Sequence, residues 1–331
     1  MANIGDVAKR AGVGVSTVSK VLNNYDNISQ ATRDKVMQAV TELNYVPNAA
    51  ASALSSKKGR RIAVVVFINN KRQAIDEINM QYLFGSFFQA NIHKLDVTTV
   101  FSGVFENMSK VEIIHYLKSL SIEAVVVYGL HKEEIFFNEI IQEEHFRTVV
   151  VDGPILNDRT SYVMVDHQKA QYDIATQIIQ KSEGTIRNVL YLAGRRDGFV
   201  TDLRLQGVVD ACDKLGVNLN AQYSDFSELK AIDLVKQYGN EADVIVCASD
   251  LMAIGAVNAL KEMDIFRPVC GYDGIKLLGY IDYPMLTVQQ DFYNVARNAI
   301  DEAKRLIADE KGQAIILDYT ITTINYEDVI M

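Results

Sequence analysis

The chain has 331 residues, of which 49% are hydrophobic and 23% charged, an ordinary composition for a globular protein with room for two or three domains. It holds no apolar run of the length that a membrane span needs and no hydrophobic signal region at its N-terminus, so we expect a cytoplasmic protein. Its three cysteines show no C-x-x-C spacing, so neither a disulfide framework nor a zinc knot is indicated.

The net charge of −9 is divided unevenly along the chain. Residues 1–61 hold nine Lys or Arg and four Asp or Glu, a net charge of +5, which leaves −14 for the other 270 residues. A basic first part on an acidic body is the asymmetry expected when only the first part touches phosphate.

The first segment has the pattern of a helix, a tight turn and a second helix. Apolar residues recur at helical spacing in two runs separated by Gly12, namely Val7, Ala8 and Ala11, then Val18, Val21 and Leu22. A third run, Val36, Val40 and Leu43, follows Ser29, which stands where a helix N-cap is expected. We predict three short helices around one small core.

The second of these helices carries the first functional prediction. If its apolar residues face inward, the opposite face carries Val15, Ser16, Ser19, Lys20 and Asn23. Such a short, polar and basic face suits the major groove of DNA, which a helix enters only if it can approach closely and reach base edges with a few longer donors. The alternative is a solvated face in an unrelated three-helix unit.

A family resemblance covers this part of the chain without interruption, through the motifs DVAKRAGVGVSTVSKVLNN, ISQATRDKV and ELNYVPNAAASALSSKK. From Ile4 to Lys58 the chain resembles the DNA-binding head and hinge of the lactose-repressor/galactose-repressor (LacI/GalR) family. The resemblance implies DNA contacts from Val15, Ser16, Thr17, Lys20, Asn23, Ser29, Thr32, Asn48, Ala51 and Leu54. Two positions depart from the family pattern. Gly14 replaces a usual serine cap, and Lys20 replaces a frequent arginine, so base preference cannot be copied from an arginine-bearing relative.

The hinge follows the third helix. Pro47 stops that helix, and Asn48 can cap a short new one, AAASAL, which is too short to be stable alone in water. In the family this segment becomes a helix on operator DNA and inserts a leucine into the minor groove, a role that would fall to Leu54. A flexible linker is the alternative.

From Arg61 onward, apolar strand runs alternate with helical runs. The strand runs are 62–67, 124–128, 148–152, 188–193 and 244–248, and the helical ones lie near 75–92, 110–120, 132–143, 169–181, 202–215, 227–238, 250–263 and 292–309. Ser109 with Glu112, and Asp225 with Glu228, have the spacing of capping boxes. This alternation predicts parallel sheets covered on both faces, and about 270 residues favour two such subdomains.

In doubly wound sheets a ligand sits beyond the carboxyl ends of the strands. Asp152, Ser249 with Asp250, and Asp273 all follow strand runs at such ends. Each could instead be a helix cap or a loop acid.

The motifs GFVTDLRLQGV, ASDLMAIGA, GYD and LTVQQDF make the body similar to the core of the same family. The resemblance implies a small all-α helix-turn-helix domain at 1–46, a hinge helix or linker at 47–60, and an α/β core of the type I periplasmic-binding-protein kind at 61–331. The core would consist of two doubly wound parallel-sheet subdomains joined by three crossings. The N-subdomain would take about 61–160 and 291–320, and the C-subdomain about 161–290 and 321–331.

The resemblance also implies an effector between the subdomains. Arg204 and Asp273 would bind its polar groups, Phe226 would stack on its ring, and Phe67, Asp152, Ser249 and Gln290 would line the cleft. An exposed helical arginine is the alternative for Arg204, and an ordinary core aromatic for Phe226. Phe67 and Ile68 stand where sugar binders often have small polar residues. The alternatives to a plain sugar as effector are therefore a glycoside, a nucleoside-like molecule or a phosphorylated sugar.

An enzyme is not expected. Gly12 and Gly14 lack the third glycine of a dinucleotide fingerprint, no P-loop or G-x-S-x-G motif is present, and the five histidines have no metal-site spacing, so we predict no cofactor and no metal. A solute-binding protein would need an export signal and would not use residues 1–58. A catabolite-control-type regulator with a protein co-regulator remains an alternative.

The sequence thus predicts a transcriptional repressor. It would bind a palindromic double-stranded DNA operator as a homodimer, with its affinity set by a small-molecule effector, sugar or sugar-like. A dimer is expected instead of a tetramer because the sequence ends soon after a predicted strand, without the family's leucine-rich tail.

Overall fold

The structure is a computed structural model that describes residues 2–22, 27–45, 60–68 and 77–330. The chain divides into two compact units, residues 1–60 and residues 61–331. Among the described residues, no helix combines the length and the apolar character needed to cross a bilayer.

The first unit contains the three predicted helices, α1 (Ile4–Ala11), α2 (Val15–Leu22) and α3 (Gln30–Glu42). Val7, Val18 and Val36, one from each helix, are fully buried and form the centre of their shared core. Gly12 ends α1 in the left-handed conformation, with φ 67°, which glycine adopts without steric cost. Ser29 caps α3 by accepting from the backbone N–H of Thr32. The predicted three-helix pattern and the Ser29 cap are confirmed.

The second unit is built on two six-stranded sheets. The first sheet has the order β11-β5-β4-β3-β1-β2 and is parallel throughout: β1 (Arg61–Val66), β2 (Asp96–Phe101), β3 (Ala124–Tyr128), β4 (Arg147–Val151), β5 (Thr160–Val165) and β11 (Ala314–Leu317). The second has the order β12-β10-β9-β8-β6-β7, with only the edge strand β12 antiparallel: β6 (Asn188–Ala193), β7 (Asn218–Tyr223), β8 (Val244–Cys247), β9 (Val269–Asp273), β10 (Leu286–Gln289) and β12 (Thr320–Thr323).

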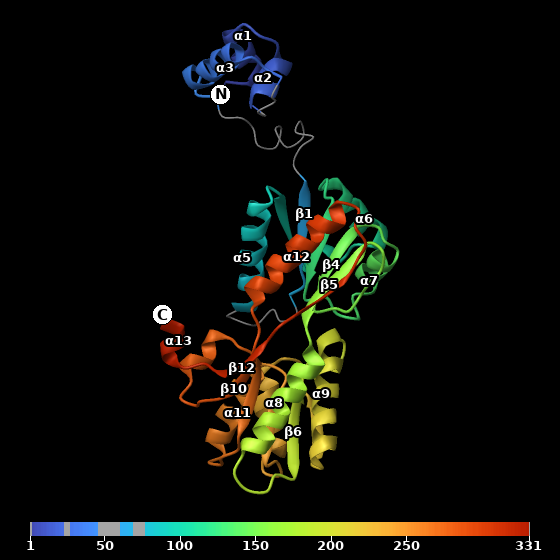
Figure 1. Cartoon of the computed structure of the whole chain (residues 1–331), viewed down its shortest axis with the longest axis vertical. Helices are drawn as coiled ribbons and strands as arrows, with labels where there is room; N and C mark the ends of the chain where they lie inside the picture. The colour runs from blue at the N-terminus through green and yellow to red at the C-terminus, as the bar shows by residue number, and fades with distance from the viewer. Residues whose placement is uncertain (1, 23–26, 46–59, 69–76, 331) are drawn as a thin grey trace. The chain divides into compact units, whose positions relative to one another are not determined.

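Helices cover both sheets. The first sheet carries α5 (Glu77–Ile92), η1 (Ser102–Phe105), α6 (Lys110–Ser119), α7 (Ile135–Gln142) and α12 (Phe292–Ile307). The second carries α8 (His167–Lys181), α9 (Phe199–Leu215), α10 (Glu228–Tyr238), α11 (Asp250–Glu262), η2 (Lys276–Tyr280) and α13 (Tyr326–Ile330). In Figure 1, α5 and α12 lie together on one face of the first sheet.

The side chains of β1 explain this arrangement. Ile62, Val64 and Val66 pack into a core with α5 and α12, whereas Ala63 and Val65 pack on the other face with α6 and α7. Because successive side chains of a strand point to opposite faces, a strand covered on both faces is apolar at every position. The predicted doubly wound fold, with a helical head, is confirmed.

The chain crosses between the sheets three times: between β5 and α8, between β10 and α12, and between β11 and β12 (Figure 1). The first crossing follows Val165, a few residues beyond the expected boundary near 160, because β5 pairs with β4 and β11 in the first sheet.

Of the two predicted capping boxes, one is present. The backbone N–H of Ser109 donates to Glu112 over 2.8 Å, and the Ser109 hydroxyl accepts from the backbone N–H of Glu112. The box of Asp225 with Glu228 is wrong, because Ser227 caps α10 and the Asp225 carboxylate binds Lys230 instead.

Candidate functional site

The outer face of α2 is the first candidate site. Val18 and Val21 point into the core, which leaves Ser16 and Lys20 exposed and Thr17 half-buried, while Val15 is 48% exposed. Lys20 has no hydrogen bond or ion pair with any described residue, so its ammonium group is available to a ligand. The backbone C=O of Gly14 accepts from the N–H groups of Thr17 and Val18 and so starts the helix without a side-chain cap.

The start of α3 lies in the same unit. The hydroxyl groups of Ser29 and Thr32 are 2.9 Å apart and hydrogen-bond to each other, so both residues already have a structural role in capping the helix. Ser29 is exposed, and the free N–H groups at a helix N-terminus attract anions such as phosphate. Four predicted DNA contacts lie outside the described residues, as does nearly all of the hinge: Asn23, Asn48, Ala51 and Leu54.

The second candidate site is a cavity of about 240 Å³ between the two sheets of the second unit. All seven residues expected at the effector line it: Phe67, Asp152, Arg204, Phe226, Ser249, Asp273 and Gln290. Most of them stand at the carboxyl ends of parallel strands, the edge at which such sheets bring segments from distant parts of the sequence together.

Arg204 is the central cation of the cavity. It is 4% exposed, so the alternative of an exposed helical arginine is wrong. Its Nη1 donates to the backbone C=O of Ala248 over 2.5 Å and lies 3.5 Å from Asp273 Oδ1. Its guanidinium group lies 3.7 Å from the ring centroid of Tyr272, in a cation–π arrangement. These contacts fix the direction in which the remaining donors face.

Asp273 ends β9 beside Arg204. Burial raises the pKa of its carboxyl group to about 8, although Arg204 acts in the opposite direction. The Gln290 Nε2 donates to Asp273 Oδ1 over 3.3 Å, while the buried Gln290 Oε1 has no hydrogen-bond partner among the described residues. An unsatisfied acceptor beside a protonated carboxyl group is ready for a ligand that offers hydroxyl groups.

His167 is a member of this site that the sequence analysis missed. It is completely buried, its Nε2 donates to Asp152 Oδ1 over 2.9 Å, and its Nδ1 accepts from the Tyr272 hydroxyl over 2.9 Å. Burial lowers the pKa of His167, so we assign the neutral ring with its proton on Nε2. Its position two residues after β5 is a usable signal, but β5 is not among the predicted strands.

Tyr82 of α5 was missed as well. Its hydroxyl donates to Asp152 Oδ2 over 3.0 Å. Asp152 therefore receives hydrogen bonds from both parts of the second unit, the part built on the first sheet and the part built on the second. Burial by itself would raise the pKa of Asp152, but the hydrogen bonds from His167 and Tyr82 and the charge of Arg204 outweigh it, and the pKa is lowered. Asp152 is therefore an ionised acceptor at neutral pH.

Phe226 reaches the cavity from the turn after β7. Asp225 and Phe226 both have left-handed backbone conformations, with φ 55° and 56°, a strained arrangement for such residues. The Phe226 ring lies on Gly194, where a Cβ atom would come within 2.1 Å of it. Only glycine at position 194 allows the ring to take this place.

Ser249 lines the cavity, whereas the neighbouring Asp250 supports it from the core. The Ser249 hydroxyl caps α11 by accepting from the backbone N–H of Met252, which leaves its proton for a ligand. Asp250 is fully buried and does not line the cavity. It accepts from the backbone N–H groups of Gly274 and Ile275 and thereby holds the turn after Asp273, so its expected place among the crevice acids is corrected to a supporting one.

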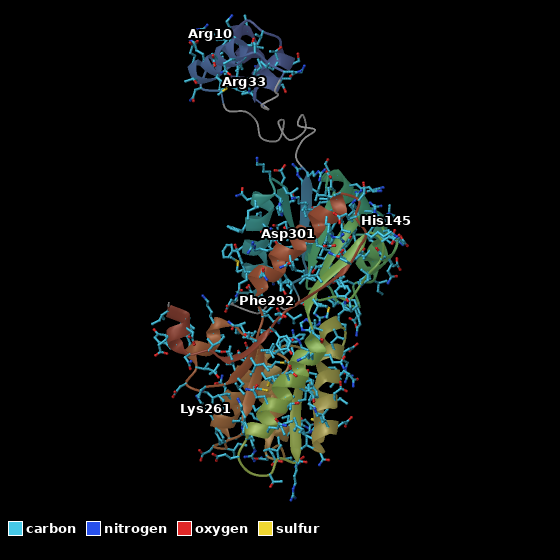
Figure 2. All side chains as sticks on the ribbon, viewed as in Figure 1. Arg10, Arg33, His145, Lys261, Phe292 and Asp301 are labelled. Carbon is cyan, nitrogen blue, oxygen red and sulfur yellow. The ribbon has the colours of Figure 1, made fainter. Side chains whose placement is uncertain are left out.

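The wall that the first sheet contributes is mainly apolar, as Phe67 and Ile68 suggested. Leu130 and Phe292 add to it, and the Phe292 ring packs edge-on against Tyr82 with 5.4 Å between centroids. Figure 2 places Phe292 at the lower end of α12, where the two parts of the second unit meet. The polar groups of the cavity come mainly from the second sheet.

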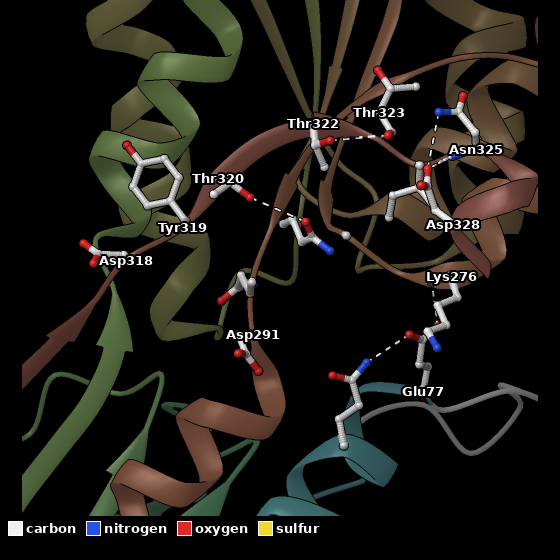
Figure 3. Close-up of a pocket in the computed structure, with 15 residues that line it drawn as sticks. Glu77, Lys276, Asp291, Asp318, Tyr319, Thr320, Thr322, Thr323, Asn325 and Asp328 are labelled. Carbon is white, nitrogen blue, oxygen red and sulfur yellow. Dashed lines mark hydrogen bonds between the residues drawn. The ribbon is translucent and has the colours of Figure 1, made fainter. Parts of the chain in front are cut away.

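Polar contacts bridge the two parts on either side of the cavity. On one side His131 Nδ1 lies 2.8 Å from Asp197 Oδ2, and Lys132 binds Asp202. On the other, Glu77 accepts from the backbone N–H of Lys276 over 2.8 Å. This second bridge lines a polar cavity of about 790 Å³ beside the crossing segments, which Figure 3 shows in close-up.

The part of the chain that the structure describes contains no group of three or more His, Cys, Asp or Glu side chains placed to hold a metal ion.

Known proteins resemble both units of the chain. Residues 3–48 match the family described as bacterial regulatory proteins, lacI family. The whole chain is 29% identical to the HTH-type transcriptional regulator RegA of Clostridium acetobutylicum over 340 residues, which cover 97% of each chain.

Two solved structures share the fold. The transcriptional regulator CelR–cellobiose complex has a TM-score of 0.71 and 23% identity, covering 98% of this chain and 100% of that one. The lac repressor dimer bound to operator and the anti-inducer ONPF has a TM-score of 0.80 and 21% identity, covering 98% of each chain.

Proposed function

We propose that this chain, a member of the LacI family of bacterial regulatory proteins, is a repressor whose affinity for its operator depends on a bound small molecule. Proteins of this family are DNA-binding transcriptional regulators and not enzymes. In this proposal two copies bind a near-palindromic operator, and a sugar or sugar-like effector binds the cavity between the sheets. Such a regulator works where the DNA is, in the cytoplasm.

The outer face of α2 carries the DNA-binding proposal. Val15, Ser16 and Thr17 are short enough to let α2 enter a major groove, and Lys20 is a donor with no competing partner among the described residues. Ser29 and Thr32 would hold phosphate at the start of α3, and Asn23 would help to position α2. In the hinge, Asn48, Ala51 and Leu54 would act in the minor groove.

An exposed apolar face on α5 supports the homodimer. Five of its large side chains are between 47% and 60% exposed: Met80, Phe84, Phe87, Phe88 and Ile92. A single helix with so much apolar surface in water is typical of an interface. A twofold pair would bury the same face of each copy, and a related repressor is a dimer on its operator.

The cavity supports a polyhydroxylated effector. Arg204 donates, Asp152 accepts, and Asp273 with Gln290 offers both kinds of group, which suits neighbouring ring hydroxyls. Phe226 and Phe67 would cover the apolar faces of the ring, and Ser249 would donate from the rim. Cellobiose is bound to CelR, a protein of the same fold.

Coupling needs an effector that prefers one arrangement of the two sheets. Since the cavity is lined from both, a bound ligand stabilises one angle between them, and a coupling of about 1–3 kcal/mol changes operator occupancy usefully. Whether the ligand releases or strengthens operator binding follows from which arrangement it prefers.

The availability of Lys20 on α2 is the observation that carries the proposal, and selection of duplex DNA from a random library tests it. We expect a palindrome with a deformable centre and a steep fall of affinity with salt. The Lys20→Ala variant serves as the control, because it should relax the preference at one half-site position. A repeat with added metabolites covers a regulator that needs a co-repressor. If neither selection enriches a sequence, the proposal is wrong.

A further inference from the structure

We propose that a proton-dependent contact at the rim of the cavity holds the two parts of the second unit together, and that His131 is the residue that responds to pH. The contact joins the loop between β3 and α7, residues 129–134, to the segment between β6 and α9, residues 194–198. We call it the rim contact. The movement that it restrains is independent of the proposed function, whereas its effect on operator binding rests on that function.

The rim contact has a fixed backbone frame. His131 and Gly198 form an isolated antiparallel bridge, and the backbone N–H of Lys132 donates to the C=O of Asp197 over 2.8 Å. The Asn138 side chain of α7 donates to the C=O groups of His131 and Lys132 over 2.9 and 3.4 Å, which holds the loop in place. Because His131 and Gly198 also line the cavity, separation of the two segments would open the cavity on this side.

The His131 side chain lies between two carboxylates, one from each segment that approaches it. Its Nδ1 is 2.8 Å from Asp197 Oδ2, and its Nε2 is 3.2 Å from Glu134 Oε1. The Nδ1 contact is not aligned as a hydrogen bond, so its attraction is that of opposite charges. A neutral imidazole has a single N–H and presents a lone pair to one of the two carboxylates, whereas an imidazolium attracts both. The protonated ring therefore favours the closed rim.

Other groups around the ring modify this attraction. Arg195 donates to Asp197 through Nε over 2.9 Å and through Nη2 over 2.5 Å. Burial by itself would raise the pKa of Asp197, but the hydrogen bond and charge of Arg195 outweigh it, so the pKa is lowered and the carboxylate is ionised at neutral pH. The charge of Arg195 opposes protonation of His131, Asp197 and Glu134 favour it, and Phe67, edge-on to the ring at 6.4 Å, adds no charge. Since the His131 and Asp197 side chains are only 13% and 9% exposed, solvent screens their attraction weakly.

A second ion pair at the rim involves no histidine. Lys132 binds Asp202 at the start of α9, and both side chains are exposed. Lysine and aspartate are both charged between pH 5.5 and pH 8, so this pair adds an attraction that changes with salt and not with pH. The rim contact thus combines one ion pair that is always present with one that needs a proton.

The experiment measures the distance between α7 and α9 in the full-length protein without ligand. Both helices begin at the rim, so spin labels at their far ends, on Gln142→Cys and Asp213→Cys, should move apart when the rim opens. The three native cysteines are buried and do not compete for the label. Pulsed electron paramagnetic resonance gives the ratio of closed to open molecules. This ratio should be about threefold to fivefold higher at pH 5.5 than at pH 8, as expected for one added ion pair.

Four variants assign the response. His131→Gln cannot be protonated, so its ratio should be equal at both pH values. His115→Gln, at an exposed position on α6, is the matched control and should respond as the wild type does. Lys132→Ala should lower the ratio at both pH values and keep the response. Asp273 titrates in the same range but is not part of the rim contact, so Asp273→Asn should keep the response as well.

An unchanged response in His131→Gln would overturn the inference, as would a wild-type ratio that is the same at both pH values. Glu134→Gln removes one of the two carboxylates beside the ring and should reduce the response, and it decides the question if His131→Gln does not fold.

The link to DNA is tested separately. On a selected palindrome, operator affinity should differ between pH 5.5 and pH 8 more in the wild type than in His131→Gln. If the distances respond and this difference is absent, the rim contact stands and its coupling to the operator is refuted. Failure of the selection itself removes the regulator proposal and leaves the distance measurement valid.

Discussion

At the scale of single residues, the cavity buries an arginine, a histidine and two carboxylates against one another. Each carboxylate is treated differently by its surroundings. Asp152 receives hydrogen bonds from His167 and Tyr82 and stays ionised, whereas burial leads Asp273 to hold its proton at neutral pH. The buried cavity thus carries a low net charge.

The raised pKa of Asp273 predicts a pH dependence. Its ordinary value is 3.8 and its folded value about 8, so the folded state holds a proton that the unfolded state has lost, and stability should fall as pH rises from about 4 to 8. Effector affinity should rise over pH 7–9, because the ionised carboxylate accepts from two hydroxyls.

Both trends should be flat in Asp273→Asn, which keeps the shape of the side chain and cannot ionise. Operator binding without effector should be unchanged in this variant, and the response to effector should be lost. Asp233→Asn, at an exposed position on α10, is the control. Thermal unfolding and effector titration across pH measure the two trends, and identical slopes in Asp273→Asn and the wild type would contradict the assignment.

Lys20 and Thr32 predict different effects on DNA binding. Lys20→Ala should relax the base preference at one half-site position at a cost of about 1–3 kcal/mol, because a base-edge donor is lost. Thr32→Ala should weaken binding to all sequences about equally. Competition assays on operator variants distinguish the two, and unchanged specificity in Lys20→Ala would show that α2 is not the recognition helix.

At the scale of elements, close helix packing shapes the second unit. The central glycine of α5, Gly85, faces α12, and a Cβ atom there would lie 2.3 Å from the backbone C=O of Tyr293. The two helices are thus in backbone contact. Because α5 places Tyr82 at the cavity and presents the exposed apolar face outward, its distance from α12 sets the position of both.

Gly85→Ala should therefore destabilise the protein by about 1–3 kcal/mol through overpacking, despite the better helix propensity of alanine. Gly103→Ala in η1, where a Cβ atom would have no neighbour within 4 Å, is the matched control and should change stability little. Urea unfolding gives both values. A stabilised Gly85→Ala variant would mean that α5 and α12 separate easily.

At the scale of the whole molecule, the α5 face predicts the oligomeric state. The wild-type protein should sediment as a dimer at micromolar concentration, and Phe84→Asp should shift it towards the monomer, because a charge would be buried in an apolar interface. Phe266→Asp, at a 71% exposed position away from α5, should remain a dimer. A tetrameric wild type, or a Phe84→Asp protein that stays dimeric, would contradict this interface.

Dimerisation and effector binding are linked in this picture through the first sheet. Phe84 is exposed on α5 and Tyr82 binds Asp152 from the same helix, two residues away. A ligand that engages Asp152 therefore acts on the element that would hold the partner copy.

The sequence pattern predicted the three helices of the head, the exposed face of α2, the alternation of strands and helices, and the strand-end residues Asp152, Ser249 and Asp273. These are local features, set by periodicity, by caps such as Ser109, and by the rule that strand ends of a parallel sheet meet. The family resemblance supplied Phe67, Phe226 and Gln290. It also supplied Arg204, whose helical position alone does not distinguish a buried side chain from a solvated one.

Which groups support those residues depends on tertiary packing. His167, Tyr82 and Tyr272 come from segments far apart in the sequence, and their contacts depend on how two sheets and their helices pack. In the structure Ser227, and not Asp225, caps α10, and Asp250 lies in the core. Burial and long-range contacts arise only when the chain packs, so a pattern of neighbouring residues in the sequence does not predict them.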